Sequence, residues 1–100
     1  MAAKKVIREK GQTRIREVEI KNKLGLHARP AAMFVRLASK FPCEIHVEKD
    51  GERVNGKSLM GLLMLAAGQG SRLKIYAEGS RAEEALNALE ELINSRFGEE

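Results

Sequence analysis

The stretch Leu24-Gly25-Leu26-His27-Ala28-Arg29-Pro30-Ala31-Ala32 marks the point where a strand-like pattern gives way to a helix-like one. Proline is favoured in the first turn of a helix, because the N–H that it lacks would have no helical partner there. Pro30 therefore predicts a helix start and places His27 at its N-terminus. Since no Ser, Thr, Asp or Asn lies between these two residues, we expect the first-turn amides to lack a side-chain cap.

The residue types at this helix start indicate a specific chemistry. Backbone N–H groups in a first turn attract anions, phosphate above all. A neutral imidazole such as that of His27 is a nucleophile, and Arg29 adds a guanidinium whose shape suits phosphate oxygens. Gly25 permits an unusual backbone conformation just before the histidine. We therefore predict that His27 accepts a phosphoryl group; the alternative is a histidine that only caps the helix or packs at its end.

Charge is unevenly distributed along the 100 residues, whose formal net charge is +4. Residues 1–16 hold six Lys or Arg against one Glu, whereas residues 17–100 hold twelve against thirteen acidic residues. A nucleic-acid-binding domain needs a basic face, usually with stacking aromatics, and aromatics make up only 4% of this chain. We therefore predict a flexible basic extension at residues 1–15, a single folded domain at 16–100 and no nucleic-acid partner.

Cysteine content and hydropathy indicate the compartment in which the protein works and whether it enters a membrane. The single cysteine, Cys43, excludes an internal disulfide and is typical of a reducing compartment. No long apolar run is present, so we expect a cytoplasmic protein without membrane insertion. Cys43 and His46 lie three apart on an expected strand, where they point to opposite faces and cannot share a metal ion. The sequence predicts neither a metal nor another cofactor.

Hydrophobic periodicity predicts seven elements in the order β-α-β-β-α-β-α. Apolar residues alternate with polar ones in the expected strands, and they form stripes at helical spacing in the expected helices. Asp50-Gly51 is a strong signal for a tight hairpin turn, and Ser80-Arg81-Ala82-Glu83 has the spacing of a capping box. The expected elements are strands at 16–21, 43–48, 52–54 and 72–78, and helices from Pro30 to just before Pro42, at 59–67, and from Ala82 to Gly98. This order predicts an α+β fold with helices on one side of a largely antiparallel sheet.

Ser58 is a good N-cap for the second of these helices. That helix is apolar on more than one face, so part of its surface is expected to stay exposed for a partner. Full burial in the core is the alternative for most of these side chains. A phosphate on Ser58 would add negative charge beside such a surface. The candidate docking residues are Leu59, Met60 and Leu63.

Two segments resemble motifs of HPr, the histidine phosphocarrier family of the phosphoenolpyruvate-dependent phosphotransferase system. Leu24-Gly25-Leu26-His27-Ala28-Arg29-Pro30-Ala31 resembles its active-site signature, and Val54-Asn55-Gly56-Lys57-Ser58-Leu59-Met60-Gly61 resembles its regulatory-serine segment. The resemblance implies an open-faced sandwich with sheet order 1-4-2-3. It also implies a stoichiometric carrier in sugar transport rather than a turnover enzyme.

The resemblance assigns a role to each candidate residue. His27 would accept a phosphoryl group on Nδ1 from phosphorylated enzyme I and pass it to IIA domains, with Arg29 helping to hold the phosphate. Ser58 would match the serine modified by HPr kinase/phosphorylase, and the helix that follows it would belong to the docking surface. The ending Leu92-Ile93-Asn94-Ser95-Arg96-Phe97 is more similar to the nitrogen-related homologue, so the carbon and nitrogen pathways both stay open.

Two other functions are compatible with parts of the sequence. A regulatory module could dock a transcription factor through the surface that follows Ser58, although the presence of His27 disfavours a purely regulatory protein. A nucleic-acid binder would depend on residues 1–16, since the remainder of the chain is almost neutral.

Overall fold

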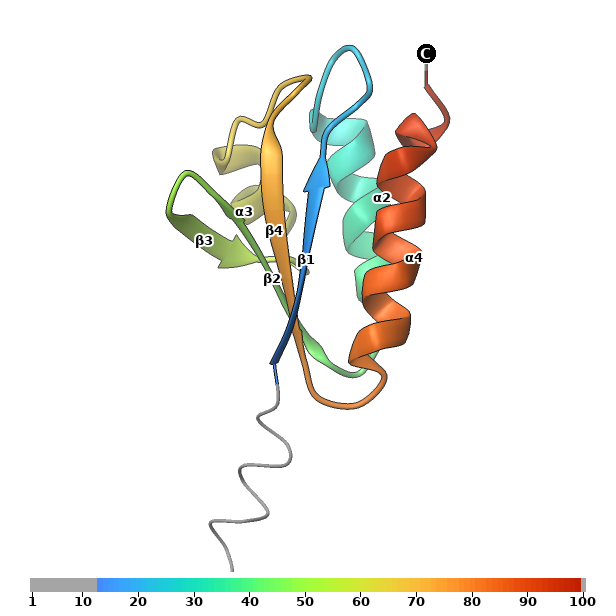
Figure 1. Cartoon of the computed structure of the whole chain (residues 1–100). Helices are drawn as coiled ribbons and strands as arrows, with labels where there is room; N and C mark the ends of the chain where they lie inside the picture. Colours follow the sequence, from blue (N-terminus) through green and yellow to red (C-terminus); the bar gives the residue numbers. More distant parts are fainter. Residues whose placement is uncertain (1–12, 100) are drawn as a thin grey trace, which may run out of the picture.

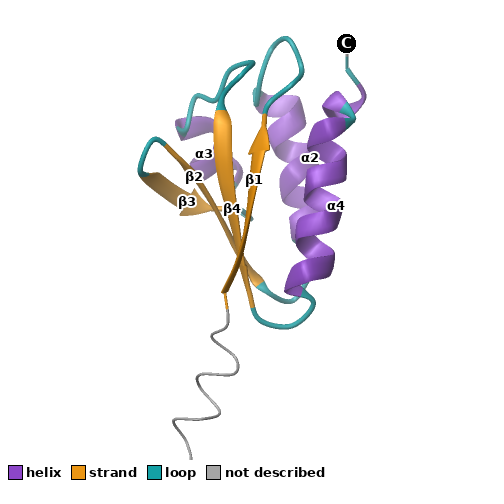
Figure 2. Ribbon diagram, in the orientation of Figure 1, coloured by secondary structure: helices purple, strands orange, loops and turns teal. Residues whose placement is uncertain are grey.

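The computed structural model describes residues 13–99, which form one four-stranded antiparallel sheet with helices on one face (Figures 1 and 2). The strands follow the order β1-β4-β2-β3. In chain order the elements are β1 (Thr13–Glu19), α2 (Ala28–Ala38), β2 (Glu44–Lys49), β3 (Glu52–Asn55), α3 (Leu59–Met64), β4 (Arg72–Glu78), α4 (Ala82–Asn94) and the 3₁₀ turn η1 (Arg96–Gly98). The predicted α+β architecture and sheet order 1-4-2-3 are confirmed.

The core lies between the sheet and the helices. In the two central strands, β2 and β4, buried residues alternate with more exposed ones, and each long helix contributes one apolar stripe. Burying one such aliphatic or aromatic side chain stabilises the fold by about 1.5–3 kcal/mol. The largest fully buried apolar side chains are Ile20, Phe34, Ile45, Val47, Leu62, Leu73, Ile75, Leu86, Leu89, Ile93 and Phe97.

The first strand begins earlier than predicted. Its ladder with β4 is regular from Thr13, paired with Glu78, to Glu19. Thr13–Ile15 therefore belong to the sheet rather than to an extension. The rest of the predicted flexible basic extension, residues 1–12, lies outside the described residues.

Charged side chains lie at helix-facing positions of β1, so the apolar alternation of Val18 and Ile20 does not extend back to the start of the strand. Arg16 lies on the helix side of the sheet, where its guanidinium bonds the Glu90 carboxylate and donates to Asn87 Oδ1 at 3.0 Å. Arg14 Nη1 lies 3.5 Å from Glu83 Oε1. Because α4 presents carboxylates along the edge of the core, arginine can occupy helix-facing positions of this strand.

The start of α4 differs from the predicted capping box. Its N-cap is Arg81, one residue later than Ser80, and the backbone there is left-handed with φ 62°. Within the described chain, this N-cap has no side-chain capping bond. The Arg81 guanidinium instead donates two hydrogen bonds of 3.0 Å to the Glu84 carboxylate. This hydrogen bonding, with the opposite charge, holds the pKa of Glu84 below its ordinary value.

All three described α-helices end earlier than predicted, and α2 stops at Ala38 rather than just before Pro42. α3 stops at Met64 rather than at residue 67, because Ala66 turns into a left-handed conformation at φ 52°. α4 stops at Asn94 rather than at Gly98. Phe97, at φ 53°, then turns the chain so that its ring is fully buried. That turn directs the last described residues back toward the loop before α2, at the same end of the molecule (Figure 1).

Candidate functional site

His27 is the N-cap of α2, as predicted. Its backbone is extended (φ −81°, ψ −169°), and its carbonyl accepts the first helical hydrogen bond from Ala31 N at 2.9 Å. Among the described residues, the start of α2 has no side-chain capping bond. The imidazole is 38% exposed, and within residues 13–99 its Nδ1 has no hydrogen-bond partner. An imidazole nitrogen therefore lies beside a helix N-terminus on a partly exposed side chain.

The loop before His27 is held rigidly. Asn22 and Gly25 close a turn, with Gly25 N donating to Asn22 O at 3.2 Å and Asn22 Nδ2 donating to Gly25 O at 2.7 Å. Leu26 N then donates to Ala67 O at 2.8 Å, which joins this loop to the segment after α3. Gly25 has φ +74°, and a Cβ there would lie 2.5 Å from Ala67 O. The predicted need for glycine arises from both the conformation and this close approach.

Glu99 completes the site, and sequence reasoning missed it. Its Oε2 lies 3.1 Å from His27 Nε2 and 3.6 Å from Arg29 Nη1, while its Oε1 accepts from Asn22 Nδ2 at 3.0 Å. The Glu99 side chain is only 15% exposed. No local pattern could have identified this residue, because 72 positions separate it from His27.

Arg29 lies in the first turn of α2, with its side chain 69% exposed. A guanidinium that is largely exposed can turn toward an incoming anion without breaking core contacts. No acidic residue lies in the first turn of α2, which is entirely within the described chain. The end of this helix therefore combines outward amides, an exposed cation and an imidazole, which is an arrangement suited to holding an anionic oxygen group.

Ser58 is the N-cap of α3, as predicted, and its Oγ accepts a hydrogen bond from Gly61 N at 3.0 Å. Of the three predicted docking residues, Leu59 and Met60 are 42% and 69% exposed, whereas Leu63 is half-buried against the core.

Three further large apolar side chains are exposed in the described residues but were not among the predicted docking residues, and one of them, Ile15, lies on β1. Met64 is 64% exposed and Leu24 is 71% exposed. The sequence carried a signal for Met64, since it follows Met60 by four positions and so shares its helix face.

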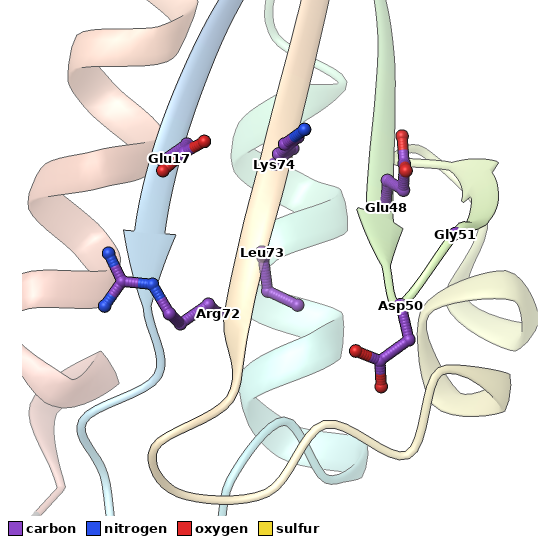
Figure 3. Close-up of a pocket in the computed structure, with 7 residues that line it drawn as sticks. All are labelled: Glu17, Glu48, Asp50, Gly51, Arg72, Leu73 and Lys74. Atoms are coloured by element: carbon purple, nitrogen blue, oxygen red, sulfur yellow. The ribbon is translucent and has the colours of Figure 1, made fainter.

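A hollow of about 330 Å³ lies elsewhere, near the β2–β3 turn (Figure 3). Its lining mixes three carboxylates with two cations, and Glu48 is already engaged by the Tyr76 hydroxyl at 2.5 Å. This hydrogen bond is the main cause that raises the pKa of Tyr76. The lining consists of Glu17, Glu48, Asp50, Gly51, Arg72, Leu73 and Lys74. The three carboxylates of this lining would repel a phosphate, which makes the hollow a poor site for phosphoryl chemistry.

The described residues hold no cluster of three or more His, Cys, Asp or Glu side chains that could bind a metal ion. Cys43 is buried at 2% exposure, and His46 is half-buried on β2. In the same part of the chain, no helix has the length and apolar character that crossing a membrane requires.

Comparison with known proteins adds independent findings. The family model described as "PTS HPr component phosphorylation site" matches residues 15–95. The phosphocarrier protein HPr of Pseudomonas aeruginosa is 55% identical over 84 residues, covering 83% of this chain and 93% of that protein. The HPr-like protein Crh of Halalkalibacterium halodurans is 53% identical over 74 residues, covering 74% of this chain and 88% of that protein.

Solved structures agree with these sequence matches. A crystal structure of HPr from Thermoanaerobacter tengcongensis superposes with a TM-score of 0.84 at 56% identity. The aligned region covers 87% of this chain and 98% of the Thermoanaerobacter tengcongensis chain. A structure of HPr from Bacillus anthracis superposes with a TM-score of 0.78 at 49% identity, covering 81% of this chain and 96% of that chain.

Proposed function

Since the chain belongs to the HPr family of phosphocarrier proteins of the phosphotransferase system, we propose that His27 accepts a phosphoryl group from phosphorylated enzyme I and passes it to IIA domains. The observation that carries this proposal is the position of the imidazole. It lies, partly exposed, at a helix start that the described chain leaves without a side-chain cap. The protein is then a stoichiometric carrier, modified in one step and restored in the next, rather than a turnover enzyme.

The proposed step forms one bond and breaks one. The lone pair of His27 Nδ1 attacks phosphorus, the donor's bond to phosphorus breaks, and its electron pair leaves with the donor. The phosphoryl oxygens then lie beside the first-turn amides of α2, which carry the positive end of the helix dipole. Arg29 turns from Glu99 toward these oxygens and offers a fork of N–H donors. Transfer to a IIA domain reverses the same steps.

We propose that partner proteins dock beside His27 over the exposed apolar residues of α3. Leu59, Met60 and Met64 support this role because apolar side chains at the centre of an interface exclude water. Leu63 contributes less surface, since it is half-buried. We propose that the carrier acts in the cytoplasm, where the single cysteine of the chain would stay reduced.

We also propose Ser58 as the site of HPr kinase/phosphorylase. A phosphate at this N-cap would be favoured by the α3 dipole and would place negative charge beside Leu59 and Met60. That charge would weaken docking of partners whose matching surface is acidic.

Incubating the full chain with enzyme I and phosphoenolpyruvate tests the carrier function. We expect an acid-labile phosphoryl adduct that His27→Ala abolishes. His46→Ala is the matched control, because His46 is the other histidine of the chain and should leave the adduct intact. An adduct that persists in His27→Ala would overturn the assignment.

A second function, regulatory docking through the Ser58 surface, is favoured by the similarity to Crh of Bacillus subtilis, whose solution structure is described as that of a catabolite repression HPr. Binding of a transcription factor to a His27→Ala chain, with and without Ser58→Asp, separates the two functions. A regulatory module still binds the transcription factor in the His27→Ala chain, and this binding depends on Ser58. A protein that acts only as a carrier shows no such binding.

A further inference from the structure

Glu99 contacts His27 at Nε2, the ring nitrogen opposite the one proposed to carry the phosphoryl group. Its Oε2 lies 3.1 Å from Nε2. An ionised carboxylate can only accept hydrogen bonds, so the imidazole nitrogen that faces it has to be the donor. A neutral imidazole has one N–H and one lone pair, and a hydrogen bond at one nitrogen decides which is which. The contact therefore favours Nε2–H and leaves the lone pair on Nδ1.

The carboxylate is held in place and does not belong to a loose tail. Its other oxygen, Oε1, accepts from Nδ2 of Asn22, whose side chain is fully buried and also bonds Gly25 O. The Glu99 backbone N–H donates to Arg96 O at 2.8 Å, and the neighbouring Phe97 ring is buried in the core. Glu99 is thus oriented from the loop before His27 and from the C-terminal turn.

Phosphoryl acceptance changes the charge of the imidazole ring. As the Nδ1–phosphorus bond forms and the donor's bond breaks, the ring keeps its Nε2 proton and becomes a phosphoimidazolium cation. A carboxylate that already accepts from Nε2–H interacts more strongly with this cation than with the neutral ring. It therefore stabilises the transition state more than the ground state.

We propose that Glu99 is a positioning residue for phosphoryl transfer, which holds His27 as the Nε2–H tautomer and stabilises the positive ring that forms when Nδ1 is phosphorylated. This inference rests on the proposed carrier function and assigns to it a residue from the far end of the chain. The opposite role is also testable. If Glu99 acted mainly as an anion that repels the phosphoryl group, neutralising it would speed the transfer.

Glu99→Gln is the direct test, because the amide keeps the size of the side chain and its oxygen can still accept from Asn22. We expect phosphoryl acceptance from phosphorylated enzyme I, measured in a single turnover, to slow by about 10- to 100-fold, the range for loss of a charge-assisted hydrogen bond. Glu99→Asp should recover part of the rate. Glu91→Gln is the matched control, since Glu91 is exposed on α4 and makes no side-chain bond within the described residues.

A spectroscopic measurement distinguishes an effect of Glu99 on the His27 tautomer from an effect on the stability of the fold. In ¹⁵N spectra of the His27 ring, the unmodified chain should show protonated Nε2 and unprotonated Nδ1, and Glu99→Gln should reduce this preference. Urea unfolding checks that each variant is folded. An unchanged rate, a faster rate or an unchanged tautomer in folded Glu99→Gln would overturn the role of Glu99. Those outcomes leave the carrier function standing, which fails only if His27→Ala still forms the adduct.

Discussion

The N-termini of α2 and α3 are built differently, although both begin with a residue in extended conformation. At α3, Ser58 Oγ accepts from Gly61 N at 3.0 Å and so caps its own helix. At α2, His27 occupies the same position, and within residues 13–99 the helix receives no side-chain cap. A helix end whose amides are satisfied locally is suited to stability, whereas one whose amides stay open is suited to binding an anion.

The two helix starts also depend on different parts of the chain. Ser58 acts through a residue only three positions away. The start of α2 is fixed by contacts with distant segments, because Leu26 N bonds Ala67 O and Asn22 bonds Glu99. The start of α2 lacks a local side-chain cap and is held by tertiary contacts instead. The predictions below test this contrast, from the largest expected effect to the smallest.

Gly25→Ala should disturb the α2 end most. A Cβ at φ +74° is strained, and it would lie 2.5 Å from Ala67 O, so the loops around α2 and α3 would have to separate. We expect the free energy of unfolding to fall by roughly 2–4 kcal/mol, measured by urea denaturation. Gly68→Ala is the control, because a Cβ there meets nothing within 4 Å. Equal losses in the two variants would contradict the rigid-loop account.

Arg29→Ala should slow phosphoryl transfer about tenfold while changing the free energy of unfolding by less than about 0.5 kcal/mol. The reason is that the guanidinium is 69% exposed and serves the anion rather than the core. Rapid-quench kinetics with phosphorylated enzyme I measures the rate. Arg36→Ala, at an exposed position near the end of the same helix, should leave the rate unchanged. Equal rates in the two variants would remove Arg29 from the site.

Ser58→Ala should lower the free energy of unfolding by about 1 kcal/mol, since it removes the capping bond to Gly61 N. Ser58→Asp should retain most of the stability, because a carboxylate can cap the helix and interacts favourably with its dipole. Ser39→Ala is the control, as Ser39 is exposed and its hydroxyl makes no bond in the described part of the chain. A Ser58→Ala chain as stable as this control would show that the cap contributes nothing.

The smallest effect is expected at α4, where Arg81 bonds Glu84 on the surface. The pKa of Glu84 is lower in the folded state than its ordinary value, so the pair stabilises the fold above that ordinary value. This contribution is lost as pH falls through the folded-state pKa. The stability difference between the wild-type chain and Glu84→Gln should therefore shrink on acidification, as followed by urea unfolding at a series of pH values. In an Arg81→Gln background this pH-dependent difference should vanish; its persistence would exclude the pair as the cause.

The sequence by itself determined the features that depend on neighbouring residues. Alternation located the strands, and Asp50 and Gly51 formed the predicted tight turn with φ 52° and 85°. Pro30 located the start of α2 and placed His27 at its N-cap, and Ser58 capped α3 as its residue type indicated. These features follow from backbone conformation and from hydrogen bonds a few residues long, which a sequence states directly.

Only the tertiary structure decided which distant groups meet. Arg16 lies on the helix side of the sheet, where α4 presents Glu90 to it. Glu99 reaches His27 across 72 positions because Phe97 is buried and turns the chain back. Such contacts depend on how completed elements pack against one another, and no local pattern of residues carries that information.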